Sequence, residues 1–288
     1  MIWQTTQWYR YALTAGMVLA AGAGTPAGAA EQFISVRDNT GAVLGGTPLL
    51  DGDIVRYDPV ADAASVYLAE SAFESGSIDV NALHVFDQGR IAFSTLFNGG
   101  IGGVSFGDGD VVEYDPATGQ ASVLLPETAW TGSITSTDVN ALFIRDDGTM
   151  LLSHNNDADT LGGVTFGDGD ILSYDPVTDV GAVLVAETAL FDDLDGDVDA
   201  LHLLPSGNLL LSFAEDEIIS GLGFADGDLV EYDPATDTAS LYMGESTYAS
   251  LGAANDTNAF SIATTVVPVP GALALLGLAG LVGRRRRR

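Results

Sequence analysis

The stretch DGDIVRYDP, residues 51–59, decides the fold because the chain repeats it. It returns as DGDVVEYDP at Asp108, DGDILSYDP at Asp168 and DGDLVEYDP at Asp226, at spacings of 57, 60 and 58 residues. Self-similarity at a fixed period of this length is the sequence signature of a repeat architecture. The chain is therefore predicted to contain four copies of one structural unit.

Two further blocks repeat with the same period. DVNAL at Asp79 returns three times at intervals of 59 residues, and a glutamate followed by Ser or Thr precedes each of these blocks. The recurring acids are Asp79, Asp138, Asp197 and Asp256, with Glu70, Glu127, Glu187 and Glu245. Each unit thus carries the same acids at the same places.

Each copy contains two predicted β-hairpins. In the second copy, VVEY leads through residues 115–119 into QASVLL, and ALFIR leads through residues 146–149 into MLLSH. The arms are rich in β-branched residues, and Asp, Pro and Gly in the connections are turn residues. Four short strands per copy predict an all-β fold, a β-propeller of about four four-stranded blades. A stacked β-solenoid is the alternative. The pattern resembles many bacterial propeller families, which implies a fold and no activity.

The ends of the repeat region are incomplete in complementary ways. Residues 33–46 look like a second hairpin without its first, and the fourth copy stops after its third strand near Thr265. An N-terminal strand that completed the last blade would remove open sheet edges. We therefore expect residues 37–44 to close the ring as an outer strand.

The N-terminus has the features of a secretory signal. Residues 1–10 carry Arg10 and no acid, residues 11–24 are apolar and small, and Ala27-Gly28-Ala29 offers a cleavage site. The apolar stretch is too short for a retained membrane helix. We predict a signal peptide over 1–29 and a mature domain over 30–265.

The C-terminus carries a second membrane-directed segment. Val-Pro-Val-Pro leads into the apolar residues 271–283 and five terminal arginines, and the segment from Val266 has the minimum length that spans a bilayer as a helix. Arginines at the end of such a helix stay cytoplasmic. The motif residues are Pro268, Pro270, Arg284, Arg285, Arg286, Arg287 and Arg288.

Residues 266–288 resemble the PEP-CTERM sorting signal of Gram-negative bacteria. The resemblance implies retention in the inner membrane, processing by an exosortase and transfer to the cell surface or an extracellular polysaccharide matrix. Val269 replaces the usual glutamate between the prolines, which leaves the processing enzyme open. A plain C-terminal transmembrane anchor is the alternative.

The charge of the repeat region excludes some partners. All 40 acids lie between Glu31 and Asp256, against four arginines, which gives that stretch a net charge of −36. Such a surface repels nucleic acid, whose binding depends on Lys and Arg, and is compatible with divalent cations and with neutral or cationic polymers. The chain has no cysteine, so neither disulfides nor thiol catalysis is available. The four arginines are Arg37, Arg56, Arg90 and Arg145.

In the predicted propeller, the Asp-Gly-Asp motifs and the other recurring acids share one face. Hard oxygen ligands suit Ca²⁺, and the strongest candidate for a calcium site has acids at alternate positions, Asp193, Asp195, Asp197 and Asp199. It departs from an EF-hand because Gly196 is misplaced and Leu204 cannot bind a metal ion. A solvated acidic loop is the alternative. For the Asp-Gly-Asp motifs we favour a role in capping turns.

Aromatic residues and histidines add weaker signals. An aromatic follows the repeated glutamate at Phe73, Trp130 and Tyr248, with Leu190 in the third copy. These rings either stack on sugars beside Glu70, Glu127, Glu187 and Glu245, or fill gaps between blades. His84 and His202 hold equivalent strand positions, which favours a half-buried ring over a metal site, and His154 is expected in a loop.

Taken together, the sequence predicts an exported, non-catalytic surface or matrix protein whose acidic face binds calcium or polysaccharide. One alternative is a secreted, calcium-dependent propeller hydrolase or lyase. Asp192, Asp193 and Asp195 form the one irregularity in the repeat that could supply its catalytic acids. A second alternative is a purely structural module.

Overall fold

The computed structural model of the protein describes residues 31–36, 42–74, 78–131, 138–156, 158–192, 196–247 and 259–263. The expected signal peptide and sorting signal lie outside these residues. Within them, no helix has the length and apolar character needed to cross a membrane.

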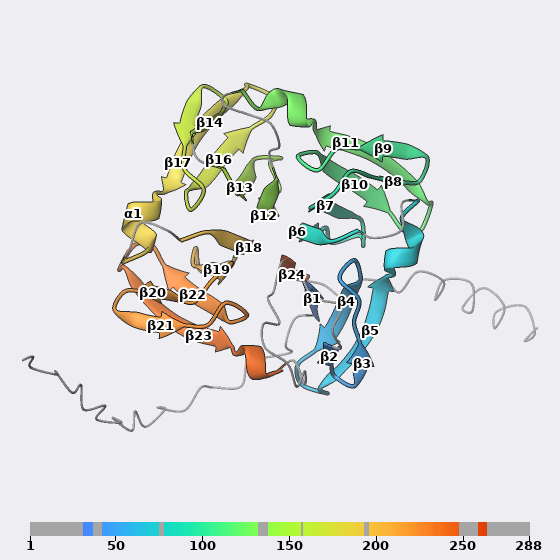
Figure 1. Cartoon of the computed structure of the whole chain (residues 1–288), viewed down its shortest axis with the longest axis horizontal. Coiled ribbons are helices and arrows are strands. Elements are labelled where there is room, and N and C mark those ends of the chain that lie inside the picture. Colours follow the sequence, from blue (N-terminus) through green and yellow to red (C-terminus); the bar gives the residue numbers. More distant parts are fainter. Residues whose placement is uncertain are drawn as a thin grey trace, which may run out of the picture.

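The described residues form four four-stranded antiparallel sheets arranged around one axis (Figure 1). We number these blades by their strands: the first is β24-β1-β4-β5, the second β6-β7-β10-β11, the third β12-β13-β16-β17 and the fourth β18-β19-β22-β23. Each innermost strand packs against the innermost strands of both neighbouring blades. The predicted all-β propeller is confirmed, and the solenoid alternative is wrong.

The strand bounds are closely matched between blades. The innermost strands are β6 (Val80–Val85), β12 (Val139–Ile144), β18 (Val198–Leu203) and β24 (Ala259–Ala263). The second strands are β1 (Glu31–Ser35), β7 (Ile91–Thr95), β13 (Met150–His154) and β19 (Leu209–Phe213). The third strands are β4 (Ile54–Asp58), β10 (Val111–Asp115), β16 (Ile171–Asp175) and β22 (Leu229–Asp233). The outer strands are β5 (Ala63–Leu68), β11 (Gln120–Leu125), β17 (Val180–Val185) and β23 (Thr238–Met243).

Both predicted hairpins of the repeat exist. The expectation that residues 37–44 form an outer strand puts the YDP hairpin on the inside of each blade, and the structure reverses that order. The DVNAL hairpin forms the inner half of each blade, and the hairpin with the YDP turn forms the outer half. Burial accompanies this order: every residue of β6 is buried, whereas β11 has three exposed, two partly buried and one buried residue. The innermost strand has neighbours on both faces and is therefore buried along its whole length.

A short extra hairpin, which the sequence did not predict, joins the second and third strands of each blade. It lies beside the outer strand, as between β9 and β11. These hairpins are β2 (Val43–Leu44) with β3 (Thr47–Pro48), β8 (Gly99–Ile101) with β9 (Val104–Phe106), β14 (Asp159–Leu161) with β15 (Val164–Phe166), and β20 (Glu217–Ile219) with β21 (Leu222–Phe224).

The ring closes through its two ends, in a different way from the one expected. β24, the last strand, is the innermost strand of the first blade, and β1 pairs with it from Glu31↔Ala263 to Ser35↔Ala259. β1 also pairs with β4, so it is a second strand rather than an outer one. The expected closing segment 37–44 is wrong: closure uses β1, and residues 37–41 lie outside the described part.

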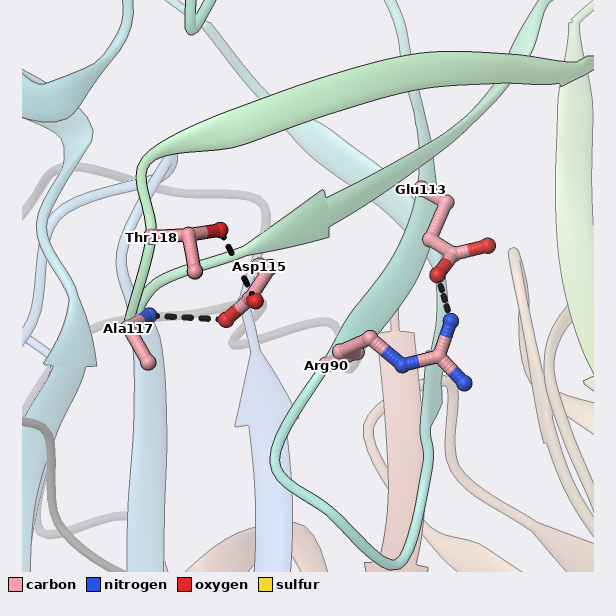
Figure 2. Close-up of polar contacts among 5 residues, drawn as sticks. All are labelled: Arg90, Glu113, Asp115, Ala117 and Thr118. Atoms are coloured by element: carbon pink, nitrogen blue, oxygen red, sulfur yellow. Dashed lines mark hydrogen bonds and ion pairs between the residues drawn. The ribbon is translucent and has the colours of Figure 1, made fainter.

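The turn between the third and outer strands is held by its first aspartate (Figure 2). The backbone N–H of Ala117 donates to Asp115 Oδ1 at 2.8 Å, and the Thr118 hydroxyl donates to Asp115 Oδ2 at 2.8 Å. These bonds, the hydroxyl first, lower the pKa of Asp115. The equivalent bonds recur at Asp175 and Asp233, so this part of the repeat is turn chemistry.

Two faces of the ring result from this topology. The turn face carries the tight turns at 86–90, 145–149 and 204–208 together with the YDP turns. The loop face carries the Asp-Gly-Asp motifs and the crossovers between blades. Each crossover contains one short helical turn: Glu70–Ala72, Glu127–Ala129, Glu245–Thr247 and α1 (Glu187–Leu190).

Candidate functional site

The second aspartate of each Asp-Gly-Asp motif is a structural cap on the loop face. In the second blade, the N–H of Gly107 donates to Asp110 Oδ2 at 2.8 Å, and the N–H of Glu127 donates to Asp110 Oδ1 at 2.6 Å. One carboxylate thus ties the loop before β10 to the crossover after β11. Asp53, Asp170 and Asp228 make the equivalent pairs of bonds. The predicted capping role is confirmed for these residues.

The glycine between the two aspartates permits a close approach of the crossover. A Cβ at Gly52 would lie 2.2 Å from the carbonyl oxygen of Ile78, and one at Gly169 would lie 2.2 Å from that of Gly196. No real Cβ reaches such a distance, so the crossover backbone occupies the space that a side chain would need. The motif is a packing and capping device in at least these two blades.

In two of the blades the repeated glutamate lies near the first aspartate of the motif. Burial and then the charge of Asp51 raise the pKa of Glu70. Burial and then the charge of Asp226 raise the pKa of Glu245. The loop face therefore brings the predicted carboxylates close enough to repel one another.

Asp138, at the start of β12, shows the strongest effect of this crowding. Burial, followed by the charge of Asp108, raises its pKa to about 6, and Asn155 opposes the shift by donating to Oδ2 at 2.9 Å. Its other oxygen, Oδ1, is buried and has no hydrogen-bond partner among the described residues. The side chain is 5% exposed, so ionisation takes place in a poorly solvated position.

The predicted calcium loop is described only in part. Asp193 and Asp195 lie outside the described residues. Asp197 accepts a hydrogen bond from Asn140 Nδ2 of the neighbouring blade at 3.0 Å, and Asp199 is buried within β18. Among the residues that the structure places, no group of three or more His, Asp or Glu side chains is arranged to hold a metal ion.

The aromatic residues proposed as a sugar-stacking row do not face solvent. Phe73 and Trp130 are 6% and 2% exposed. Phe73 packs edge-on against Phe93, and Trp130 packs edge-on against His154. Of the two alternatives for these rings, the one that fills gaps between blades is confirmed for Phe73 and Trp130, because the helical turn before each ring directs it between blades. Tyr248 lies outside the described residues.

Glu74, the residue after Phe73, and Asp192, in the third crossover, each contact the neighbouring blade. The backbone of Glu74 bonds Gly100 in the next blade's β8–β9 hairpin, and its carboxylate accepts the N–H of Gly103 at 2.9 Å. Asp192 holds the equivalent place and accepts the N–H of Gly221 at 3.0 Å. Asp192, the first of the three acids that could have been catalytic, therefore stabilises a contact between blades.

A second candidate site, which the sequence did not predict, lies at the centre of the turn face. A cavity of about 620 Å³ opens there. Its walls come from the inner strands and their turns, including Phe86, Phe143, Ile144, Leu203 and Ile262. The lining residues of this cavity differ between blades, so no repeated motif indicates it in the sequence. The one signal in the sequence was that His84, Phe143 and His202 hold equivalent positions in the repeat.

Four side chains hold equivalent positions on the innermost strands: His84, Phe143 and His202 line the cavity, and Ser261 is buried. The N–H of Ile144 donates to His84 Nδ1 at 3.3 Å, and that of Ile262 donates to His202 Nδ1 at 3.3 Å. The N–H of Val85 donates to Ser261 Oγ at 3.0 Å. These side chains satisfy backbone donors on the exposed edge of the next innermost strand.

The imidazoles of His84 and His202 are neutral at pH 7. Burial lowers the pKa of His84 to about 4 and that of His202 to about 3. Both rings contact Phe143 edge-on, at centroid distances of 5.1 and 5.0 Å. The predicted ring position is correct, but the residues are 7% and 4% exposed rather than half-buried.

His154 differs from its expected position. It ends β13 rather than lying in a loop, and it is fully buried against Trp130 and Phe166. Its Nδ1 accepts the N–H of Asn156 at 2.9 Å, and burial lowers its pKa to about 4. The apolar pocket between blades, which the aromatic residues create, explains why the strand continues to this position.

Two of the four arginines of the repeat region line the cavity. Arg90 forms an ion pair with Glu113 (Figure 2) and stacks over Phe86 at 4.8 Å. Arg145 has no salt bridge to any residue that the structure describes. Arg56 pairs with Glu31, and Arg37 lies outside the described residues.

No protein-family model and no curated protein matches the sequence. Among solved structures, the chain is similar to the extracellular domain of a one-component system from B. thetaiotaomicron, with 12% identity over 78% of this chain and 24% of that chain and a TM-score of 0.32. It is also similar to an auxiliary nutrient binding protein from Bacteroides thetaiotaomicron, with 11% identity over 75% and 42% of the two chains and a TM-score of 0.35.

A third similar structure is regucalcin, a calcium-binding protein from Agrobacterium tumefaciens, with 12% identity over 74% of this chain and 59% of that chain and a TM-score of 0.33. The chain spans less than two thirds of each of these three proteins. Identities this low concern the fold alone.

Proposed function

We propose that the protein is an exported, non-catalytic propeller, held at the cell surface or in an extracellular matrix, that presents its acidic loop face to divalent cations and polysaccharide. The observation that carries the proposal is the placement of the two ends of the propeller, Glu31 and Ala263. Glu31 pairs with Ala263, and Ile262 lines the turn-face cavity. Both ends of the propeller therefore lie at the turn face, opposite the acidic loops.

This placement gives the sorting signal a consistent geometry. A chain held in the inner membrane by residues 266–288, with an exosortase acting near Pro268 and Pro270, keeps its turn face nearest the lipid. The Asp-Gly-Asp motifs and the glutamates then point away from the lipid, toward the solution outside the cell. The strongly acidic domain is exposed to ions and polymers outside the cell.

Crowded carboxylates support cation binding at the loop face. The raised pKa values of Glu70, Asp138 and Glu245 arise in part from neighbouring acids. A divalent cation such as Ca²⁺ would relieve this repulsion through oxygen ligands. Asp197 and Asp199, together with Asp193 and Asp195, remain the proposed calcium loop.

Site-directed labelling tests the orientation, because the chain has no cysteine of its own. Thr128 is exposed on the loop face and Gln88 on the turn face. In membrane-held protein on spheroplasts, we expect Thr128→Cys to react with a bulky, membrane-impermeant maleimide at least about threefold faster than Gln88→Cys. In the same variants without residues 266–288, the two rates should be similar.

The control without the tail separates shielding by the membrane from intrinsic reactivity. Protection of both cysteines in spheroplasts, with labelling only after lysis, would place the domain in the cytosol and overturn the proposal. Faster labelling of Gln88→Cys in the anchored protein would overturn the orientation. Mass spectrometry of the surface-released protein reports in addition whether the chain is cut near Pro268.

A further inference from the structure

The turn-face cavity has the size and lining of a small-molecule site. Its volume of about 620 Å³ falls in the range of ligand pockets, roughly 300–1,000 Å³. Phe143, Leu203 and Ile262 supply apolar walls from three different blades. These walls belong to innermost strands, so the backbone around the cavity is fixed by the ring itself.

The polar groups at the base of the cavity are hydrogen-bond donors. Nδ1 of His84 and Nδ1 of His202 each accept a backbone N–H. In a neutral imidazole the other nitrogen then carries the proton, so each Nε2 presents an N–H. Neither Nε2 has a hydrogen-bond partner among the described residues, and both rings line the cavity.

The rim of the cavity holds two of the four arginines of the repeat region, Arg90 and Arg145, beside two aspartates, Asp87 and Asp146. Arg90 is already paired with Glu113, and Arg145 is without a salt bridge in the described part of the chain. Asp87 and Asp146 stand on the exposed turns beside them. In a domain with ten acids for each base, an arginine kept at a cavity rim is a point of attraction for an anion.

We propose that the turn-face cavity binds a small aromatic carboxylate, whose carboxyl group pairs with Arg145 and whose ring lies against Phe143 and the imidazoles of His84 and His202. The offered groups match this class: a guanidinium for the carboxylate, edge-on aromatic contacts for the ring, and N–H donors for an oxygen substituent. Neither the loop-face acids nor the sorting signal takes part, so this site is independent of the proposed function.

Isothermal titration of the full chain in a non-ionic detergent, with 2-naphthoate as the probe and 2-naphthamide as its neutral counterpart, tests the proposal. We expect saturable binding of 2-naphthoate at one site, and binding of 2-naphthamide at least about tenfold weaker, because the amide forms no ion pair with Arg145. The comparison of the two probes needs no variant, so it stands even if a substitution impairs folding.

Matched variants locate the site. Arg145→Gln should weaken 2-naphthoate binding about tenfold or more, whereas Arg56→Gln, which removes the same charge from the Glu31 pair away from the cavity, should leave it unchanged. Asp146→Asn removes a negative charge that repels the carboxylate of the ligand, and should strengthen binding about two- to fivefold. His202→Phe copies the residue that the third blade uses, and should weaken binding of naphthoates that carry a ring hydroxyl more than that of 2-naphthoate.

Three results would overturn the proposal. One is the absence of any heat of binding up to millimolar 2-naphthoate. Another is equal binding by the wild type and by a well-folded Arg145→Gln variant. The third is binding that appears only in a chain shortened to end at Thr265, which would show that the protein's own tail occupies the cavity. None of these outcomes bears on export, which the labelling experiment tests separately.

Discussion

A single carboxylate holds two parts of the loop face together in each blade, and the second blade shows this most clearly. Asp110 accepts N–H groups from Gly107 and from Glu127. Without the side chain both donors lose their partner in a partly buried loop, and a buried donor left unpaired costs about 1–3 kcal/mol. The neighbouring Asp108, in the same motif, instead adds to the charge that raises the pKa of Asp138.

We therefore predict that Asp110→Ala lowers the free energy of unfolding by about 2 kcal/mol or more, whereas Asp108→Ala changes it by less than about 1 kcal/mol. Urea denaturation of the two variants measures both values. Equal losses in the two variants would contradict the assignment of the cap to the second aspartate.

The buried histidines predict how stability depends on pH. Burial lowers the folded-state pKa of His202 from its usual 6.5 to about 3, so the folded state resists protonation. Above pH 6.5 the ring is neutral in both the folded and the unfolded state, and the full free energy of unfolding is present. As the pH falls from 6.5 toward 3, the unfolded state takes up the proton more readily, and the free energy of unfolding decreases by up to about 1.4 kcal/mol per pH unit. His84 and His154 act in the same direction, down to about pH 4.

His202→Phe should reduce this loss between pH 6.5 and 4, because one of the three groups no longer titrates. At pH 7 the variant should be less stable by about 1 kcal/mol, since the N–H of Ile262 loses its acceptor. Asp138, with its raised pKa, acts in the opposite direction between pH 4 and 6 in both proteins. Denaturation curves at half-unit pH intervals give the slopes, and identical slopes would rule out titration of His202.

At the scale of the strand and hairpin, the repeat alone was enough to predict both hairpins of each blade, because alternating β-branched arms and Asp-Pro-Gly turns are local signals. It could not predict which hairpin is the inner one, because a tandem repeat has no intrinsic starting point. The order depends on burial from both sides, and VNALHV satisfies this better than QASVLL.

The inserted hairpins escaped prediction for a different reason. β8 and β9 are three residues each, and Gly99 and Gly100 in the first have no side chains to show an alternating pattern. Their conformation depends on tertiary contacts, such as that of Glu74 with the next blade. The buried positions of Phe73 and Trp130 depend on the same packing, so the sequence left open whether these rings faced solvent.

For the candidate sites, the sequence located the loop-face acids because they recur in every copy. The turn-face cavity was not predictable in this way, since it combines residues that differ between copies, such as His84 and Phe143. Only closure of the ring brings these side chains together. A site whose residues differ between the copies of a repeat can be located only once the structure is known.

At the scale of the whole molecule, the closed ring depends on the pairing between the first and the last strand of the propeller. β24 supplies the innermost strand of the first blade and β1 the strand beside it. The pairing places both ends of the propeller at the turn face and positions Ile262 at the cavity. Loss of β24 would expose the edge of β1 and remove the inner packing of β6 and β18.

Thermal unfolding of two shortened chains tests this account most directly. A chain that ends at Thr265 retains β24 and should unfold in one cooperative transition at the melting temperature of the mature protein. A chain that ends at Asn258 lacks β24 and should melt at least about 10 °C lower, with loss of amide-exchange protection in β1. Equal melting temperatures and equal protection of β1 in the two chains would contradict the closed four-bladed ring.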